Sequence, residues 1–281
     1  MATRTGHFPI GFRRAGVEWQ KDLPKLAKWS KDAGFDVIDL SARSSGEEFN
    51  ALKVAGLSAG SVDLLDFGQI MSADTGKRKE VIDANVKYVK NMTALGARAF
   101  FTCLIPGEPA RQRSENYRLA VDSFGPIAHA AAESGAAMAI EGWPGGPPYY
   151  ANLCCTPETV RQFIVDVGKG AGINYDPSHL IRLGVDHIRF LKEFGEHVKH
   201  VHAKDTDVDQ DALYEFGTQT AAFAQPHRYG LRASVAHHLQ TCQRAGAAPR
   251  HFADDLAVVL HTLVVDARNE IVGAQSCAMA W

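Results

Sequence analysis

No stretch of the 281-residue sequence approaches the roughly 20 consecutive apolar residues of a membrane span. The first residues, Met1–Pro9, contain no apolar run of the kind found in a signal peptide. The five cysteines are odd in number, and none has the spacing of a zinc site. We therefore expect a protein of the reducing cytoplasm that has no membrane partner.

A strong charge of either sign is also lacking. The sequence has 30 basic and 32 acidic residues, which gives a formal net charge of −2. No global positive field would therefore draw the protein to nucleic acid or to an anionic membrane, and we expect neither as a partner.

Short apolar runs alternate with longer helical patterns, as expected of repeated βα units. The predicted strands are Phe8–Phe12, Val37–Leu40, Ser58–Leu64, Ala99–Leu104, Ala137–Glu141, Gly172–Asp176 and Val198–Lys204. The predicted helices are Trp19–Ala33, Glu47–Val54, Lys77–Leu95, Ser114–Ser134, Pro157–Val167 and His187–Phe194. The ends of the predicted helices carry glycines in the place of C-terminal caps, namely Gly34, Gly56, Gly96, Gly135 and Gly195.

Seven consecutive units before the last quarter of the chain favour a single α/β domain, a TIM-type (β/α)8 barrel. The sequence does not define the eighth strand. A doubly wound open sheet is the alternative, but no glycine-rich phosphate loop follows the first predicted strand.

Three consecutive predicted strands end in a polar side chain. Chemistry in such a barrel takes place at the C-terminal ends of the strands, and strand residues alternate between the interior and the helix-facing side. This alternation points Glu141, Asp176 and His202 inward. Two carboxylates and an imidazole suit one divalent ion, which could be Mn²⁺, Mg²⁺, Co²⁺ or Zn²⁺.

Each of these residues also has an ordinary structural role as its alternative. Glu141 could cap the next loop or pair with an arginine, and Asp176 before a proline is a common turn starter. His200 lies one pleat deeper than His202, and we expect it to be a hydrogen-bonded interior residue. The joint pattern at three successive strand ends favours a metal site.

Three motifs near these residues resemble the sugar phosphate isomerase/epimerase superfamily, the xylose isomerase-like barrels. They are Ile-Glu-Gly-Trp-Pro-Gly, Asn-Tyr-Asp-Pro-Ser-His-Leu and His-Val-His-Ala-Lys-Asp. The order of elements agrees with that superfamily from about Phe8 to Tyr229. The resemblance implies one divalent metal bound by Glu, Asp, His and a final Glu, and Glu141, Asp176 and His202 match the first three.

The resemblance also implies catalytic and substrate-binding residues. Glu141 would exchange a proton with the substrate, and His179 matches the superfamily's histidine on the substrate side. Trp143, His179 and Lys204 would bind the substrate. Their ordinary alternatives are a proline-rich loop around Trp143, a loop histidine at His179, and an ion pair between Lys204 and Asp205.

The leading interpretation is a metal-dependent isomerase or epimerase of a sugar or sugar-like polyol, acting by proton transfer through an enediolate. A dehydratase of a keto-polyol uses similar chemistry. An apurinic-site endonuclease shares this barrel but needs further metal ligands, and no histidine lies between His7 and His129. A homodimer is a candidate assembly, because paired barrels are common in the superfamily.

The resemblance ends after Tyr229. We therefore divide the chain into barrel units one to seven, in residues 1–229, and an atypical segment, residues 230–281, that could replace the last βα unit. No lysine follows Lys204, and this shift suggests either a changed reading frame near Gly230 or simple divergence.

The final glutamate of the superfamily has no clear counterpart in the tail. The acidic candidates after Gly230 are Asp254, Asp255, Asp266 and Glu270, and the run Leu256–Val265 could be a strand or a helix. A non-catalytic or defective barrel that still binds a metal or a ligand is therefore a further alternative.

Overall fold

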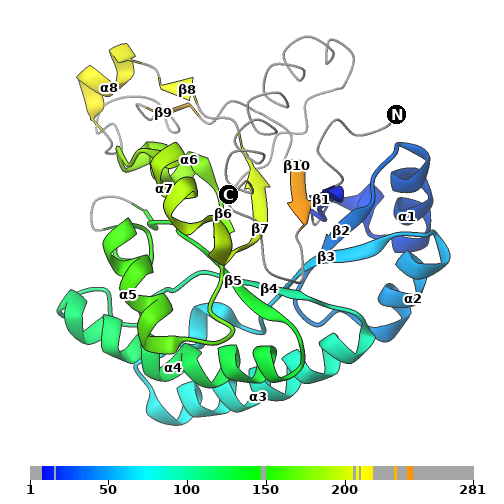
Figure 1. Ribbon diagram of the computed structural model, residues 1–281, viewed down its shortest axis with the longest axis horizontal. Coiled ribbons are helices and arrows are strands. Elements are labelled where there is room, and N and C mark those ends of the chain that lie inside the picture. Colours follow the sequence, from blue (N-terminus) through cyan, green and yellow to red (C-terminus); the bar gives the residue numbers. More distant parts are fainter. Residues whose placement is uncertain are drawn as a thin grey trace.

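The computed structural model describes residues 8–15, 17–146, 150–204, 207–208, 210–217, 231–232 and 239–242. Seven parallel strands curl into a barrel with helices on its outer side (Figure 1). The strands are β1 (Ile10–Arg13), β2 (Val37–Leu40), β3 (Ser58–Asp63), β4 (Ala99–Thr102), β5 (Ala137–Glu141), β6 (Ile173–Tyr175) and β7 (Val198–Ala203). The predicted barrel fold is confirmed.

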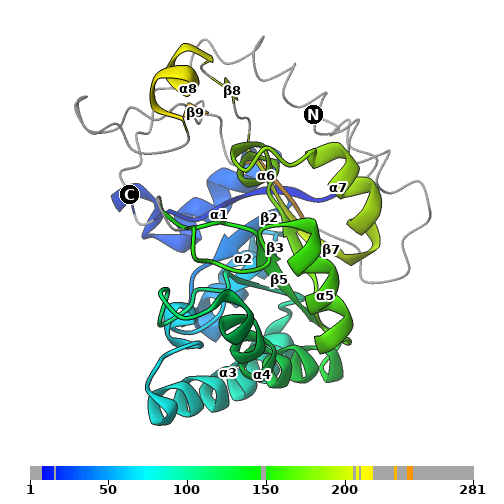
Figure 2. The same cartoon turned by 90° about the vertical axis from the view of Figure 1, so that its left-hand side faces the viewer.

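The helices that connect these strands are α1 (Leu23–Asp32), α2 (Gly46–Val54), α3 (Thr75–Leu95), α4 (Arg113–Glu133), α5 (Pro157–Val167), α6 (Pro177–Arg182) and α7 (His187–Phe194). Helices α3 and α4 pack side by side on the outside of the sheet, and a second view shows them together at one side of the molecule (Figure 2). Among the described residues, no helix is both long and apolar enough to cross a membrane.

The place of the eighth strand is taken by β10 (Leu239–Cys242). This strand pairs with β7 on one side and with β1 on the other, antiparallel to both, and so closes the barrel (Figure 1). A closed barrel excludes the open-sheet alternative. Three further short elements are β8 (Asp207–Val208), α8 (Gln210–Phe216) and β9 (Leu231–Arg232), and β8 pairs with β9. The run Leu256–Val265 lies outside the described residues.

Most predicted elements match the observed ones within a few residues, and three differ for local reasons. The predicted helix Trp19–Ala33 is split into a 3-10 turn (Glu18–Gln20) and α1, because Asp22 caps the backbone N–H of Lys25 at 3.1 Å. Gly195 keeps a right-handed backbone, with φ of −54°, and continues into a 3-10 turn. Helix α6 was not predicted, because it is only six residues long.

The predicted alternation of faces along β5, β6 and β7 is confirmed. Met138, Tyr175 and Val201 are buried in the apolar layer between sheet and helices. Their neighbours along the strands, which include Asn174 and His200, turn into the barrel and are buried there as polar groups. Polar groups in a closed interior are stable only when they are paired, and their partners define the candidate site.

Candidate metal centre

The three predicted metal ligands lie together at the C-terminal ends of their strands. Glu141 ends β5, Asp176 follows β6 and caps α6 through Ser178, and His202 lies on β7. His202 Nδ1 is 2.7 Å from Glu141 Oε2 and 4.0 Å from Asp176 Oδ2. All three side chains are buried.

The spacing of these groups fits one small ion. One possible ligand atom from each residue lies within 4.8 Å of the corresponding atoms of the other two. An ion at about 2.1 Å from each ligand needs ligand atoms no more than about 4.2 Å apart. A small side-chain adjustment satisfies this limit, and two carboxylates with one imidazole form a donor set for a divalent cation.

Two of the predicted substrate-side residues face the same carboxylates. His179 Nε2 is 2.7 Å from Glu141 Oε1 and 3.4 Å from Asp176 Oδ2. Lys204 Nζ is 2.6 Å from Asp176 Oδ2 and 3.8 Å from Glu141 Oε1. Asp205, the alternative partner of Lys204, lies outside the described residues.

The charges of this cluster stabilise one another. Burial alone would raise the pKa of Glu141, but His202, Lys204 and the hydrogen bond from His179 hold it well below its usual value. Burial alone would lower the pKa of Lys204, but Asp176 and Glu141 raise it. Glu141 is therefore a carboxylate and Lys204 an ammonium ion at neutral pH.

Trp143 lies in the half-buried loop after β5. Its backbone carbonyl accepts hydrogen bonds from the Asn152 side chain at 3.1 Å and from the Cys155 thiol at 3.4 Å. Among the described residues, no ring contact joins Trp143 to Glu141 or His179. Residues 147–149 of the same loop lie outside the described residues.

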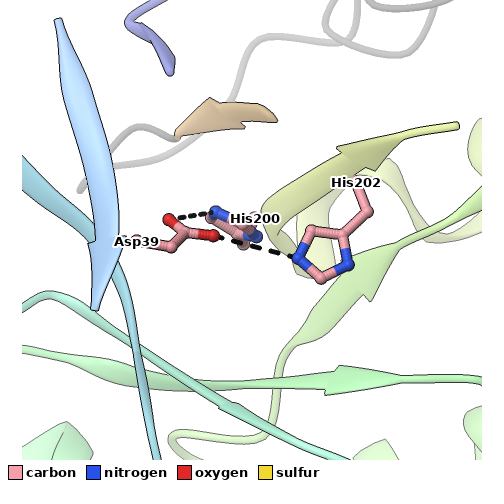
Figure 3. Close-up of side chains that lie close together, drawn as sticks. All are labelled: Asp39, His200 and His202. Atoms are coloured by element: carbon pink, nitrogen blue, oxygen red, sulfur yellow. Dashed lines mark hydrogen bonds and ion pairs between the residues drawn. The ribbon is translucent and has the colours of Figure 1, made fainter. Parts of the chain in front are cut away.

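A hydrogen-bonded chain runs through the interior behind the predicted ligands. Asn174 Nδ2 donates to Glu141 Oε2 at 3.0 Å, and Asn174 Oδ1 accepts from His200 Nδ1 at 2.7 Å. His200 Nε2 lies 3.2 Å from Asp39 Oδ1 on β2 (Figure 3). The prediction that His200 is a hydrogen-bonded interior residue is confirmed.

Asp39 was not singled out in the sequence. The signal was present, because Asp39 alternates with the buried residues Ile38 and Leu40 and must therefore face the barrel interior. Burial alone would raise the pKa of Asp39, but His200 and His202 hold it below its usual value. Asp39, His200 and His202 form a second buried group whose ligand atoms lie within 4.8 Å of one another.

Arg13 and Asp63 form a partly buried ion pair that the sequence also did not reveal. They end β1 and β3 and pair at 2.6 Å between Nη2 and Oδ2. The guanidinium lies over the Phe101 ring at 4.6 Å, and that ring packs against His202 with centroids 5.2 Å apart. The Arg13 Nη1 atom is buried without a hydrogen-bond partner among the described residues. An unused hydrogen-bond donor therefore lies near His202.

The four acidic residues considered as a final ligand lie outside the described residues. They are Asp254, Asp255, Asp266 and Glu270.

Most of the barrel matches a known family of proteins. Residues 22–229 match the family described as xylose isomerase-like TIM barrel. The chain belongs to this family. Over 62 residues, this member of the xylose isomerase-like family is 37% identical to the uncharacterized protein YfiH of Bacillus subtilis (strain 168), a stretch that is 22% of this chain and 20% of that protein. The chain thus matches about a fifth of this curated relative.

Known structures share the fold at low identity. A D-psicose 3-epimerase, crystallised in the presence of D-fructose, has 16% identity and a TM-score of 0.57 over 69% of this chain and 74% of that one. The 3-keto-D-glucoside 4-epimerase of E. coli, in its apo form, has 17% identity and a TM-score of 0.57 over 90% and 98%. The probable 3-DHS dehydratase AsbF of Bacillus anthracis has 16% identity and a TM-score of 0.56 over 79% and 82%.

Proposed function

We propose that this xylose isomerase-like barrel is a metal-dependent isomerase or epimerase of a sugar or sugar-like polyol. The observation that carries the proposal is the convergence of Glu141, Asp176 and His202 at three successive strand ends, with His179 and Lys204 against the same carboxylates. Two of the structural relatives are epimerases of sugars or sugar derivatives.

In this proposal Glu141, Asp176 and His202 bind one divalent ion, which is Mn²⁺, Mg²⁺, Co²⁺ or Zn²⁺. When bound, the ion supplies a Lewis acid that polarises a substrate carbonyl. Glu141 is ionised, so it can accept a proton from the carbon beside that carbonyl. His179 donates to Glu141 in the metal-free protein and would turn to a substrate hydroxyl, while the Lys204 ammonium would balance the charge of an enediolate oxygen.

The available groups favour proton transfer on one face of the substrate. Glu141 and His179 lie on the same side of the cluster, 2.7 Å apart. Aldose–ketose isomerisation needs one such group, whereas epimerisation needs a second group on the opposite face. We therefore expect isomerisation to survive without a group from residues 230–281, and epimerisation to depend on one.

The test is proton exchange in deuterated water. The protein is loaded with Mn²⁺ or Co²⁺, incubated with a panel of aldoses, ketoses and keto-polyols, and the recovered compounds are analysed by mass spectrometry. Deuterium at the carbon beside the carbonyl, lost in Glu141→Gln, supports the proposal. Loss of water without exchange of recovered substrate would favour the dehydratase. A metal-loaded protein that exchanges nothing would favour the non-catalytic barrel.

The proposal also concerns compartment and assembly. Cys103, Cys154 and Cys155 are free and buried. This supports a reducing compartment such as the cytoplasm. A homodimer remains the proposed assembly, and light scattering of the purified protein tests it.

A further inference from the structure

A fully enclosed carboxylate lies on the opposite side of His202 from the proposed metal ligands. Asp39 is 1% exposed and sits on β2, across the barrel from β7. Its Oδ1 atom accepts the backbone N–H of Ser61 at 2.6 Å and lies 3.2 Å from His200 Nε2. Its Oδ2 atom has no hydrogen-bond partner among the described residues and lies 3.9 Å from His202 Nε2 (Figure 3).

The two nitrogens of His202 face different carboxylates. Nδ1 faces Glu141 and Asp176, at 2.7 Å and 4.0 Å, whereas Nε2 faces Asp39. The lone pairs of the two nitrogens point away from each other. An ion bound at Nδ1 therefore lies beyond the reach of Asp39, and Asp39 is not the missing fourth ligand.

Metal binding at Nδ1 decides where the ring proton must be. In the metal-free protein the short Nδ1–Glu141 distance requires a proton on Nδ1. An ion can bind only to a deprotonated Nδ1, so the one remaining proton of the neutral ring is on Nε2. That proton faces Asp39 Oδ2, which can accept it after a small movement. Carboxylates that hold the second nitrogen of a metal-binding histidine orient the ring and raise its basicity.

Asp39 also reaches a second ligand through the interior chain. Its Oδ1 atom contacts His200, whose other nitrogen donates to Asn174, and Asn174 donates to Glu141 Oε2. Glu141 accepts this bond only while its carboxylate is turned toward β6. The chain thus fixes the orientation of the Glu141 carboxylate.

We infer that Asp39 is the positioning carboxylate of the centre, which orients His202 directly and Glu141 through His200 and Asn174. The inference rests on the proposed metal site. It predicts one ion per chain, on the Nδ1 side of His202. An ion among Asp39, His200 and His202 would contradict it, because Asp39 would then be a ligand itself.

The test compares Asp39→Asn with Asp63→Asn. Both changes remove one buried carboxylate from neighbouring strands, and Asp63 pairs with Arg13 rather than with a histidine. The side-chain amide oxygen that Asp39→Asn introduces can still accept the Ser61 N–H, which favours folding, and circular dichroism checks both variants. Zn²⁺ binding to the metal-free proteins is titrated by calorimetry. We expect Asp39→Asn to weaken Zn²⁺ binding by about 10- to 100-fold, and Asp63→Asn to weaken it by less than about threefold.

A spectroscopic readout separates orientation from general loss of charge. In Zn²⁺-loaded wild type, side-chain ¹⁵N NMR should show His202 protonated on Nε2, with slow exchange of that proton. In Asp39→Asn the exchange should become fast. Equal Zn²⁺ affinities of the two variants, or two ions in the wild type, would overturn the inference while leaving the metal site standing. A wild type that binds no Zn²⁺, Mn²⁺ or Co²⁺ would overturn the proposed function and the inference with it.

Discussion

Replacing Lys204 by methionine should destabilise the metal-free protein and, at the same time, strengthen its binding of a divalent ion. The Lys204 ammonium lies 2.6 Å from Asp176 Oδ2 and 3.8 Å from Glu141 Oε1. With an effective dielectric constant of about 20, these distances correspond to roughly 6 and roughly 4 kcal/mol of attraction. The cost of desolvating the buried ammonium offsets a large part of this attraction. Loss of one partner of a buried ion pair costs about 3–5 kcal/mol, so the metal-free variant should lose about 3 kcal/mol of its free energy of unfolding.

The same substitution should strengthen metal binding. The ammonium occupies the carboxylate oxygens that a divalent ion needs and also repels that ion. Its removal should raise the affinity for Mn²⁺ at least about tenfold, which is about 1.4 kcal/mol. A bound ligand adds RT ln(1 + [L]/Kd) to the stability of the folded state. Saturating Mn²⁺ should therefore reduce the difference in free energy of unfolding between the variant and the wild type.

The assay is urea unfolding of chelator-treated and Mn²⁺-saturated protein, with Mn²⁺ affinity measured by calorimetry. Lys199→Met is the matched control, because Lys199 lies on the same strand and donates only to the Glu196 carbonyl, at 3.0 Å, among the described contacts. Equal losses of metal-free stability in the two variants would show that the Lys204 ion pairs do not stabilise the fold. A weaker affinity of Lys204→Met for Mn²⁺ would show that the ammonium does not compete with the ion.

Three further predictions follow from the same geometry. Asp176→Asn should weaken Mn²⁺ binding by at least about 100-fold, because one of the three ligands loses its charge. The control Asp166→Asn, at an exposed position, should leave Mn²⁺ binding unchanged, and calorimetry measures both affinities. The folded-state pKa of Glu141 lies below its usual value of 4.5, so Glu141 stabilises the metal-free fold above pH 4.5 and loses this contribution as the pH falls toward the folded pKa. The free energy of unfolding of Glu141→Gln should therefore fall less steeply below pH 4.5 than that of the wild type. The same pH dependence in both proteins would contradict this. Burial raises the pKa of the Cys103 and Cys154 thiols, so both should resist maleimide at about pH 7 until urea unfolds the chain, as mass spectrometry of labelled peptides would show.

The regular part of the fold could be predicted because each strand carries its own pattern. The alternation in Ala137–Glu141 separates the apolar face, with Met138 and Ile140, from the face that carries Glu141. The structure keeps both faces as predicted. The closing strand β10 could not be predicted, because its antiparallel pairing with β1 and β7 depends on contacts between residues far apart in the sequence.

The site could be predicted only where its residues lie in recognisable motifs. Glu141, Asp176 and His202 end three consecutive strands, so their convergence follows from the barrel itself. Asp39 meets His200 across 161 positions of the sequence, and nothing local to either residue indicates that partner. Arg13 and Asp63 were missed for a similar reason: they lie 50 positions apart, on two strands that both pair with β2, and the pattern around neither residue indicates its partner.

The metal content of the purified protein decides whether Glu141, Asp176 and His202 bind a divalent ion. Wild type, Glu141→Gln and the control Glu133→Gln, whose side chain is 69% exposed, are stripped with chelator, incubated with Mn²⁺ or Co²⁺, desalted and analysed by elemental analysis. We expect about one ion per chain in the wild type and in Glu133→Gln, and little or none in Glu141→Gln. A wild type that retains no ion, or equal ion content in all three proteins, would show that these residues do not form a metal site.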